Sequence, residues 1–183
     1  MKYIARRFRM KGGDHCVLRS PEPSDAAQRI AFLKMVNAET PFMARGANDS
    51  PADGEMVADL IADQLEDDWV IEIAAFIGDE MIASGGVGPV SRAYPRKRHR
   101  ASLGICVRRA YWGQGIASAI IDALAAEAAR IGYSQIELTV VSDNLRARAL
   151  YERCGFRQVG CMPNARRYED GTFRDEIWMV KEI

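Results

Sequence analysis

A glycine-rich turn constrains this chain more than any other feature. Residues 103–107 form an apolar run typical of a buried strand, and Gly113 and Gly115 stand just before a stretch with helical periodicity. Glycines allow the backbone to come close to a ligand, and the first turn of a helix offers free N–H groups and the positive end of the helix dipole. The stretch predicts a strand, a turn and a helix that bind a pyrophosphate group.

The remaining pattern predicts an α/β fold with a mixed sheet, since hairpins come early and a strand–helix–strand unit comes late. No repeat or Pro/Gly/Ser-rich linker divides the chain, so we expect a single domain over residues 1–183. Ser24 should cap the first helix, Gly132 should end the third, and Leu60 should lie on the buried face of the second. The expected helices are 24–38, 52–67, 113–131 and 144–153, and the expected strands are 2–11, 15–20, 69–76, 81–90, 101–107, 135–141, 156–162 and 176–182.

Cysteine usage favours neither a metal centre nor a disulfide framework. The four cysteines form no C-x-x-C pair, and the chain has only two histidines. A chain of 183 residues can bury roughly two thirds of its unfolded surface without such supports, so we expect four buried thiols and no metal. No apolar run reaches the roughly 18 residues of a membrane span, and the first residues lack the apolar core of a signal peptide. We therefore expect a cytoplasmic protein that contacts no membrane.

The formal net charge of zero hides a strong segregation of charge. Residues 46–91 contain no Lys or Arg but eleven acidic residues, which leaves 25 basic against 14 acidic residues in the rest of the chain. The electric field of such a charge distribution would steer a cationic ligand to one side of the molecule and a phosphate-rich ligand to the other. Added salt would weaken this effect.

Two kinds of site could use the glycine-rich turn. The residues Gly113-x-Gly115-x-x-Ser118 resemble a dinucleotide fingerprint in which Ser replaces the third Gly. A Rossmann turn, however, places its first Gly at the end of the strand, whereas residues 108–112 intervene here. The acid expected at the end of the next strand is also missing, because Glu137 lies near its start. These differences disfavour a nicotinamide dinucleotide as ligand.

The turn is more similar to the GNAT superfamily of N-acetyltransferases, whose signature is Q/R-x-x-G-x-G/A. The chain reads Trp112-Gly-Gln-Gly115-Ile-Ala117, with Trp at the first position. A second stretch, Asn144-Leu-Arg-Ala-Arg-Ala-Leu-Tyr-Glu-Arg-Cys-Gly-Phe156, resembles the second signature of the family, an Asn followed by Ala, Leu-Tyr and Gly-Phe. The resemblance extends from about Val17 to the C-terminus.

The resemblance implies a GNAT fold, with a mostly antiparallel sheet of about seven strands, a splayed strand pair and about four helices. It also implies acetyl-CoA as co-substrate, with its pantetheine arm between the strand ending at Val107 and the strand beginning at Gln135. The backbone amides of residues 113–118 would hold the pyrophosphate. The residues assigned to acetyl-CoA in this way are Ile105, Cys106, Val107, Trp112, Gly113, Gln114, Gly115, Ile116, Ala117, Ser118, Asn144 and Tyr151.

The reaction implied is direct attack of a neutral amine on the thioester. It needs a base for the amine proton, a donor such as a strand N–H near Val107 for the oxyanion, and a proton donor for the departing thiolate. The position of Tyr151 in the second signature matches the last role. A tyrosine packed between helix and sheet for structural reasons is the alternative.

The base is not identified by the resemblance. Some family members carry a Glu where this chain has Ala101, and others where it has Thr139. His99 and Glu72 remain as candidates, together with an ordered water molecule. His99 stands between two arginines in a basic loop, where a lone His is more often solvated, and the hairpin pattern favours a solvent-facing Glu72.

The acceptor is expected to be a small amine. The run His99-x-Ala-x-x-Gly-Ile-x-Val107 is most similar to a bacterial branch that acetylates free amino acids and related amines. Acetylation of a protein N-terminus or lysine, and a non-catalytic acyl-CoA binding module, are the alternatives. The basic run 92–100 could contact the 3′-phosphate of CoA or an acidic acceptor, or be a solvated loop; without interleaved aromatic residues it does not favour nucleic acid. The acidic segment would border the acceptor site and favour a cationic amine. The oligomeric state stays open, a homodimer included.

Overall fold

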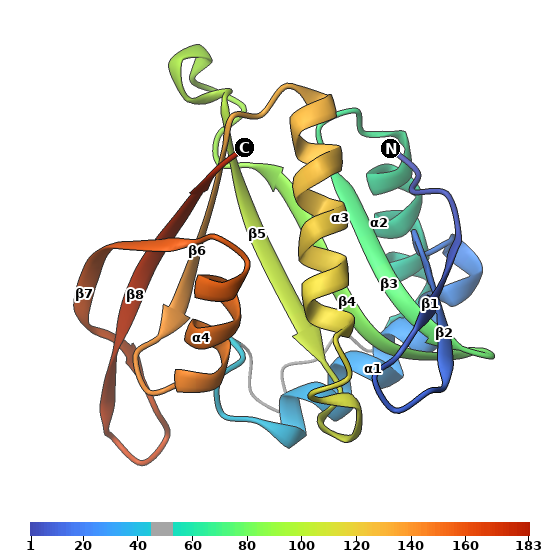
Figure 1. Cartoon of the computed structure of the whole chain (residues 1–183), viewed down its shortest axis with the longest axis horizontal. Coiled ribbons are helices and arrows are strands. Elements are labelled where there is room, and N and C mark those ends of the chain that lie inside the picture. The colour runs from blue at the N-terminus through green and yellow to red at the C-terminus, as the bar shows by residue number, and fades with distance from the viewer. Residues whose placement is uncertain (45–52) are drawn as a thin grey trace.

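The computed structural model describes residues 1–44 and 53–183, which form a mixed sheet with helices on both faces (Figure 1). Its strand order is β1-β2-β3-β4-β5-β6-β8-β7, and every neighbouring pair in it is antiparallel except β5 and β6. The α/β GNAT-type architecture is therefore confirmed, with eight strands in the described residues instead of about seven. The strands are β1 (Arg6–Arg9), β2 (His15–Arg19), β3 (Ile71–Ile77), β4 (Glu80–Pro89), β5 (Arg100–Val107), β6 (Gln135–Val141), β7 (Arg157–Arg167) and β8 (Phe173–Glu182).

Four α-helices of the described residues cover the sheet. Helices α3 (Ile116–Ile131) and α4 (Leu145–Arg153) lie on one face, and α1 (Ala26–Glu39) and α2 (Gly54–Glu66) lie on the other (Figure 1). Helix α3 buries an apolar stripe completely, including Ile120 and Leu124, in the larger core. A smaller core on the opposite face joins Phe32 of α1 to Phe76 of β3. The sheet is thus packed on both faces, although not along its whole width.

The parallel pair β5 and β6 separates after a short contact. Only Arg100, Ala101 and Ser102 of β5 pair with β6, opposite residues 135–137. Beyond them each strand continues to its own carboxyl end without pairing to the other. The expected splayed pair is confirmed, and the opening between the strands widens toward Val107 and Val141. A largely antiparallel sheet also excludes the parallel dinucleotide-binding fold.

Several local expectations change for identifiable reasons. Helix α3 begins at Ile116 and not at Gly113, because Gly113 and Gly115 have φ values of +79° and +85°, outside the helical region. Ser24 is not a helix cap, since it lies inside a 3₁₀ turn, Pro23–Asp25, that precedes α1. Leu60 is 48% exposed on α2, so its predicted burial was wrong.

The expectation of four buried thiols was also wrong. All four cysteines are free, but Cys161 is exposed, because β7 is the edge strand of the sheet. Among the described residues, no three His, Cys, Asp or Glu side chains come together as a metal site requires. No helix in the same residues is long and apolar enough to cross a membrane.

Candidate active site

The glycine-rich loop leads from β5 into α3 and leaves backbone donors free. Gly115 occupies the N-cap position and has no side chain with which to cap the helix. The amides of Ile116, Ala117 and Ser118 therefore have the unsatisfied character of any first helical turn. At Gly113 a Cβ atom would meet no heavy atom within 4 Å, so the space beside the loop is open. This arrangement can bind an anion through backbone N–H groups and the helix dipole.

The hairpin of β1 and β2 braces this loop from one side. The carbonyl oxygen of Gln114 accepts a hydrogen bond from the Lys11 N–H at 3.1 Å, and its Oε1 accepts one from the Gly12 N–H at 2.8 Å. The ring of Phe8 lies 3.6 Å from the position of a Cβ on Gly115. Because both oxygens of Gln114 are engaged in bracing, the contact predicted between this residue and the co-substrate would rest on its N–H groups.

Trp112 links the two sides of the opening at its mouth. Its indole Nε1–H donates to the carbonyl of Val107, at 2.8 Å, and so holds the end of β5. The guanidinium of Arg146, in the first turn of α4, lies 4.1 Å from the centre of the indole ring. Since the only polar atom of Trp112 is engaged, its ring is what remains to contact a ligand.

Asn144 and Tyr151 stand on the other side of the same opening. The Asn144 side chain caps α4, with Oδ1 accepting from the Ala147 N–H at 3.1 Å. In the described residues its Nδ2 group has no partner and can donate to a ligand. The structure thus places the unpaired part of β5, the glycine-rich loop and the Asn144 amide around one opening.

Tyr151 is a buried side chain whose hydroxyl borders accessible space. Its ring packs edge-on against Phe156, with 5.8 Å between the ring centres. The hydroxyl makes no hydrogen bond with the described residues, yet it is not among their fully buried unpaired polar atoms. Burial, with smaller contributions from the Cys106 and Cys154 thiols, raises the pKa of Tyr151 to about 12. The hydroxyl therefore stays protonated and can donate a hydrogen bond throughout the physiological pH range.

The opposite face of β5 and β6 is only partly covered by the described helices, since Cys106 packs against the α1 cluster but its neighbours on this face do not. Helices α1 and α2 pack over β3 and β4, whereas Ser102, Gly104 and Thr139 on this face are exposed. A Cβ atom on Gly104 would meet no heavy atom within 4 Å. This face therefore leaves β5 accessible to an acceptor, on the side of the sheet opposite the glycine-rich loop and α3.

Glu72 of β3 lies on the same face of the sheet, buried beneath α1 and α2 and not in solvent, so the solvent-facing alternative was wrong. Its carboxylate is 10% exposed and accepts from the Ser84 hydroxyl at 2.7 Å and from Arg29 at 2.8 Å. In the sheet Glu72 lies opposite Gly86, and Gly86 lies opposite Gly104. A buried, charge-paired carboxylate is thus held two strands away from the open part of β5.

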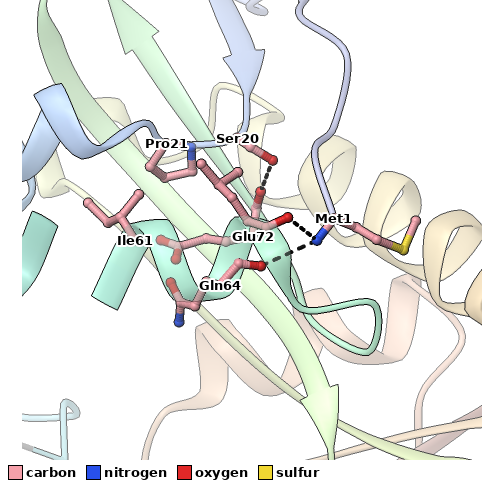
Figure 2. A pocket seen from close by; sticks show the side chains of 7 residues that line it. Met1, Ser20, Pro21, Ile61, Gln64 and Glu72 are labelled. Atoms are coloured by element: carbon pink, nitrogen blue, oxygen red, sulfur yellow. Dashed lines mark hydrogen bonds between the residues drawn. The ribbon is translucent and has the colours of Figure 1, made fainter. Parts of the chain in front are cut away.

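The pocket behind Glu72 is too small for an acceptor. Figure 2 shows it between Ser20, Pro21, Ile61 and Gln64, with the Ser20 hydroxyl donating to the Glu72 carbonyl at 2.7 Å. The cavity measures about 10 Å³, close to the space of one water molecule. The hydrogen bond from Ser20 holds the backbone of Glu72 at this pocket, and the pocket itself has no room for an acceptor.

His99 is not brought to this site. It is exposed beside the closed end of the opening, where its carbonyl accepts from the Ser134 and Gln135 N–H groups. Five residues separate it from Gly104, about 16 Å along an extended strand. The basic run 92–100 lies at the same end, between β4 and β5, so the structure does not bring it to the phosphate-binding loop either.

Two residues of the site were not predicted from the sequence. Arg29 and Ser84, the partners of Glu72, come from α1 and β4 and meet only in the folded chain. One signal was present in the sequence, because Arg29 shares a helical face with Phe32 and Val36, three and seven residues later. A charged residue on such a face needs a buried partner.

Comparison with known proteins agrees with this geometry. The model of the acetyltransferase (GNAT) family matches residues 34–156, more than half of the chain. The solved acetyltransferase of the GNAT family from Streptococcus pneumoniae is 28% identical, with a TM-score of 0.86 over 92% of this chain and 99% of that one. A search of curated proteins finds no match.

Two further solved structures share the fold at lower identity. The ribosomal-protein-alanine N-acetyltransferase from Brucella melitensis is 18% identical with a TM-score of 0.79, covering 91% of this chain and 99% of that one. The phosphinothricin acetyltransferase from Sinorhizobium meliloti, in complex with acetyl-CoA, is 16% identical with a TM-score of 0.76, covering 92% and 88%. Together with the splayed strands and the glycine-rich loop, the family match shows that this chain belongs to the acetyltransferase (GNAT) family and is an acetyl-CoA-dependent acetyltransferase.

Proposed function

We propose that this enzyme transfers the acetyl group of acetyl-CoA to the primary amine of a small metabolite, such as an amino acid. The observation that carries this proposal is a contact across the acceptor face. Arg166 of β7 donates to the carbonyl of Phe42, just after α1, at 3.1 Å, and also pairs with Glu176. The contact closes one side of the acceptor face, as a small substrate requires and an extended polypeptide does not.

Direct transfer in a ternary complex is favoured by the state of the nearest cysteine. Cys106 lies in β5 at the opening, and burial, followed by the nearby Glu72 carboxylate, raises the pKa of its thiol to about 12. A thiol must ionise to act as a nucleophile. The acetyl group therefore passes to the amine without an acetyl-cysteine intermediate.

The proposed roles follow from position. The amine nitrogen attacks the thioester carbon, the carbon–sulfur bond breaks, and the proton of the attacking amine passes to Glu72 directly or through water. A backbone N–H of β5 near Val107 stabilises the oxyanion. Tyr151 donates a hydrogen bond to the departing sulfur; because an ordinary thiol has a pKa of about 8.5, the thiolate does not take the Tyr151 proton outright.

The acidic segment supports a cationic acceptor. Asp59, Asp63 and Glu66 are exposed along α2, and no ion pair in the described residues neutralises them. They would raise the local concentration of a protonated amine before it binds and loses its proton. If the acceptor is cationic, kcat/KM for it should decrease as ionic strength rises.

A panel of amines, assayed by release of the CoA thiol, tests the proposal. It should contain amino acids of different charge, a peptide with a free N-terminus and a lysine peptide with a blocked N-terminus. A kcat/KM for a free amino acid at least tenfold above that of either peptide supports the proposal. A preference for a peptide would favour the protein acetyltransferase alternative, and tight CoA binding without turnover of any amine would favour the non-catalytic one.

A further inference from the structure

Two cations flank the glycine-rich loop from opposite sides. The side chain of Lys11, in the turn between β1 and β2, has its Cε and Cγ atoms 3.8 and 3.9 Å from the Cβ position of Gly115. Arg146 stacks on Trp112 from the first turn of α4. Figure 1 shows the β1–β2 hairpin on one side of α3 and α4 on the other.

Neither cation has an acidic partner. Most other arginines near the opening, such as Arg108, Arg166 and Arg174, form ion pairs, but among the described residues Lys11 and Arg146 form none. Each exposed side chain lies instead against an uncharged surface, the Gly115 backbone or the indole ring, so its N–H donors form no bond within the described residues. A cation held in this way keeps its full charge for a ligand.

We propose that Lys11 and Arg146 bind phosphate groups of acetyl-CoA and thereby select it over thioesters without phosphates. The unpaired amides at the start of α3 lie between the two cations, so a ligand bound there is within the field of both. Stacking on Trp112 fixes the plane of the Arg146 guanidinium and leaves its edge free to donate two hydrogen bonds to one phosphate. Lys11 lies outside residues 34–156, so the family match does not assign it a role.

Binding measurements on charge-removing variants test this proposal. Lys11→Met keeps the methylene chain against Gly115, and Arg146→Gln keeps a planar polar group on Trp112. The matched controls are Lys97→Met and Arg96→Gln, which remove exposed cations of the 92–100 loop at the far end of β5. Dissociation constants for CoA and for 3′-dephospho-CoA are measured by calorimetry without any amine, so the result does not depend on the acceptor.

We expect each of the two variants to bind CoA about tenfold more weakly, as loss of a charge-assisted hydrogen bond predicts. A loss seen with CoA but not with 3′-dephospho-CoA assigns that cation to the 3′-phosphate, and an equal loss assigns it to the pyrophosphate. The control variants should bind CoA within twofold of the unsubstituted protein.

A phosphate-free substrate separates recognition from folding. The KM for acetyl-N-acetylcysteamine, which retains the thioester but has no phosphate, should be unchanged within twofold in Lys11→Met and Arg146→Gln. The proposal is overturned if both variants bind CoA as tightly as the controls do. It is also overturned if they lose activity with the phosphate-free thioester as much as with acetyl-CoA.

Discussion

The two sides of the opening between β5 and β6 carry opposite kinds of electrostatics. The side that faces α3 and α4 offers backbone amides and two cations without acidic partners. The acceptor side has carboxylates that are each held by an arginine, namely Glu72 with Arg29, Glu137 with Arg100, and Glu176 with Arg166. The acceptor side thus keeps its unpaired charge on the exposed acids of α2, whereas the loop side keeps two cations without acidic partners beside the glycine-rich loop.

This difference follows from what each side must do. A polyanion is bound by charge that is not already neutralised, and the binding energy then depends on salt. A proton acceptor needs a carboxylate that stays in place while an uncharged amine approaches it, and an ion pair provides that fixed position. The acceptor face therefore selects by shape and hydrogen bonding, and long-range attraction of a cationic amine is left to the exposed acids of α2.

The largest effect is expected from Tyr151→Phe, which removes the hydroxyl that lies between the two sides. We expect kcat to fall a few hundredfold, the range seen when one donor to a developing charge is lost, while CoA affinity changes less than twofold. With a pKa of about 12, Tyr151 itself should cause no loss of activity as pH rises to 10. Tyr133→Phe is the matched control, because Tyr133 is also buried but donates to the Trp69 carbonyl far from the opening. A kcat within threefold of the unsubstituted enzyme would remove Tyr151 from the mechanism.

A smaller loss is expected from Glu72→Gln, which acts on the acceptor side alone. We expect kcat to fall about fiftyfold, since general-base catalysis contributes a hundredfold or more and water replaces part of it. The affinity for CoA should be unchanged. Glu127→Gln is the control, because Glu127 is also paired with an arginine at 2.8 Å but lies on α3. As Arg29 loses its partner, thermal unfolding is measured alongside, and full activity in a folded variant would show that water alone is the base.

Gly115→Ala should weaken CoA binding at the glycine-rich loop, on the cofactor side of the opening. With φ at +85°, an Ala at this position costs roughly 1–2 kcal/mol through backbone strain, although its Cβ would make only an ordinary contact with Phe8 at 3.6 Å. Relief of this strain changes the backbone of the loop. We expect CoA to bind about tenfold more weakly, with an unchanged KM for the amine. Gly132→Ala places the same strain at the far end of α3, where φ is +107°, and should reduce stability without changing CoA affinity. Equal effects of both variants on CoA binding would contradict a specific role for the loop.

The smallest effect concerns Glu39, which ties α1 to the segment before the loop. Burial alone would raise the pKa of Glu39. Hydrogen bonds from the Arg109 N–H and the Arg108 side chain nevertheless hold this pKa below its usual range. Because the folded pKa is the lower one, this contribution is present at neutral pH and is lost as pH falls below about 4. We expect Glu39→Gln to lower the free energy of unfolding by less than about 1 kcal/mol at pH 7. The difference should shrink in urea titrations as pH is lowered from 7 toward 3, and a difference that stays constant over that range would contradict this account.

The comparison also explains which parts of the site could be predicted from the sequence. The cofactor side is built from contiguous stretches, the strand, loop and helix around Gly115 and the segment from Asn144 to Tyr151. In such stretches the backbone freedom of glycine and the capping of helices depend on residues close in the sequence, so the order of residues is enough to predict the local structure. The splay of β5 from β6 was implied by the family resemblance that these stretches carry.

The acceptor side could not be predicted in this way. The environment of Glu72 depends on Arg29 and Ser84, which are separated from it in the sequence and meet through sheet register and helix packing. His99 stands one residue before β5, and the length of the strand therefore separates it from Val107 at the other end. On the cofactor side Lys11 is the exception to contiguous stretches, because hydrogen bonds from its hairpin to Gln114 span about a hundred residues.

The early separation of β5 from β6 gives the sheet four strand edges where an unbroken sheet has two. Only three residue pairs join the strands, so the sheet carries edges at β1 and β7 and two more in its interior. Unpaired edges attract other strands, and the pantetheine arm, with its two amide groups, has the length and polarity of a short peptide. We propose that the co-substrate pairs with these interior edges as a further strand would, and helices α3 and α4 shield the same edges from other chains.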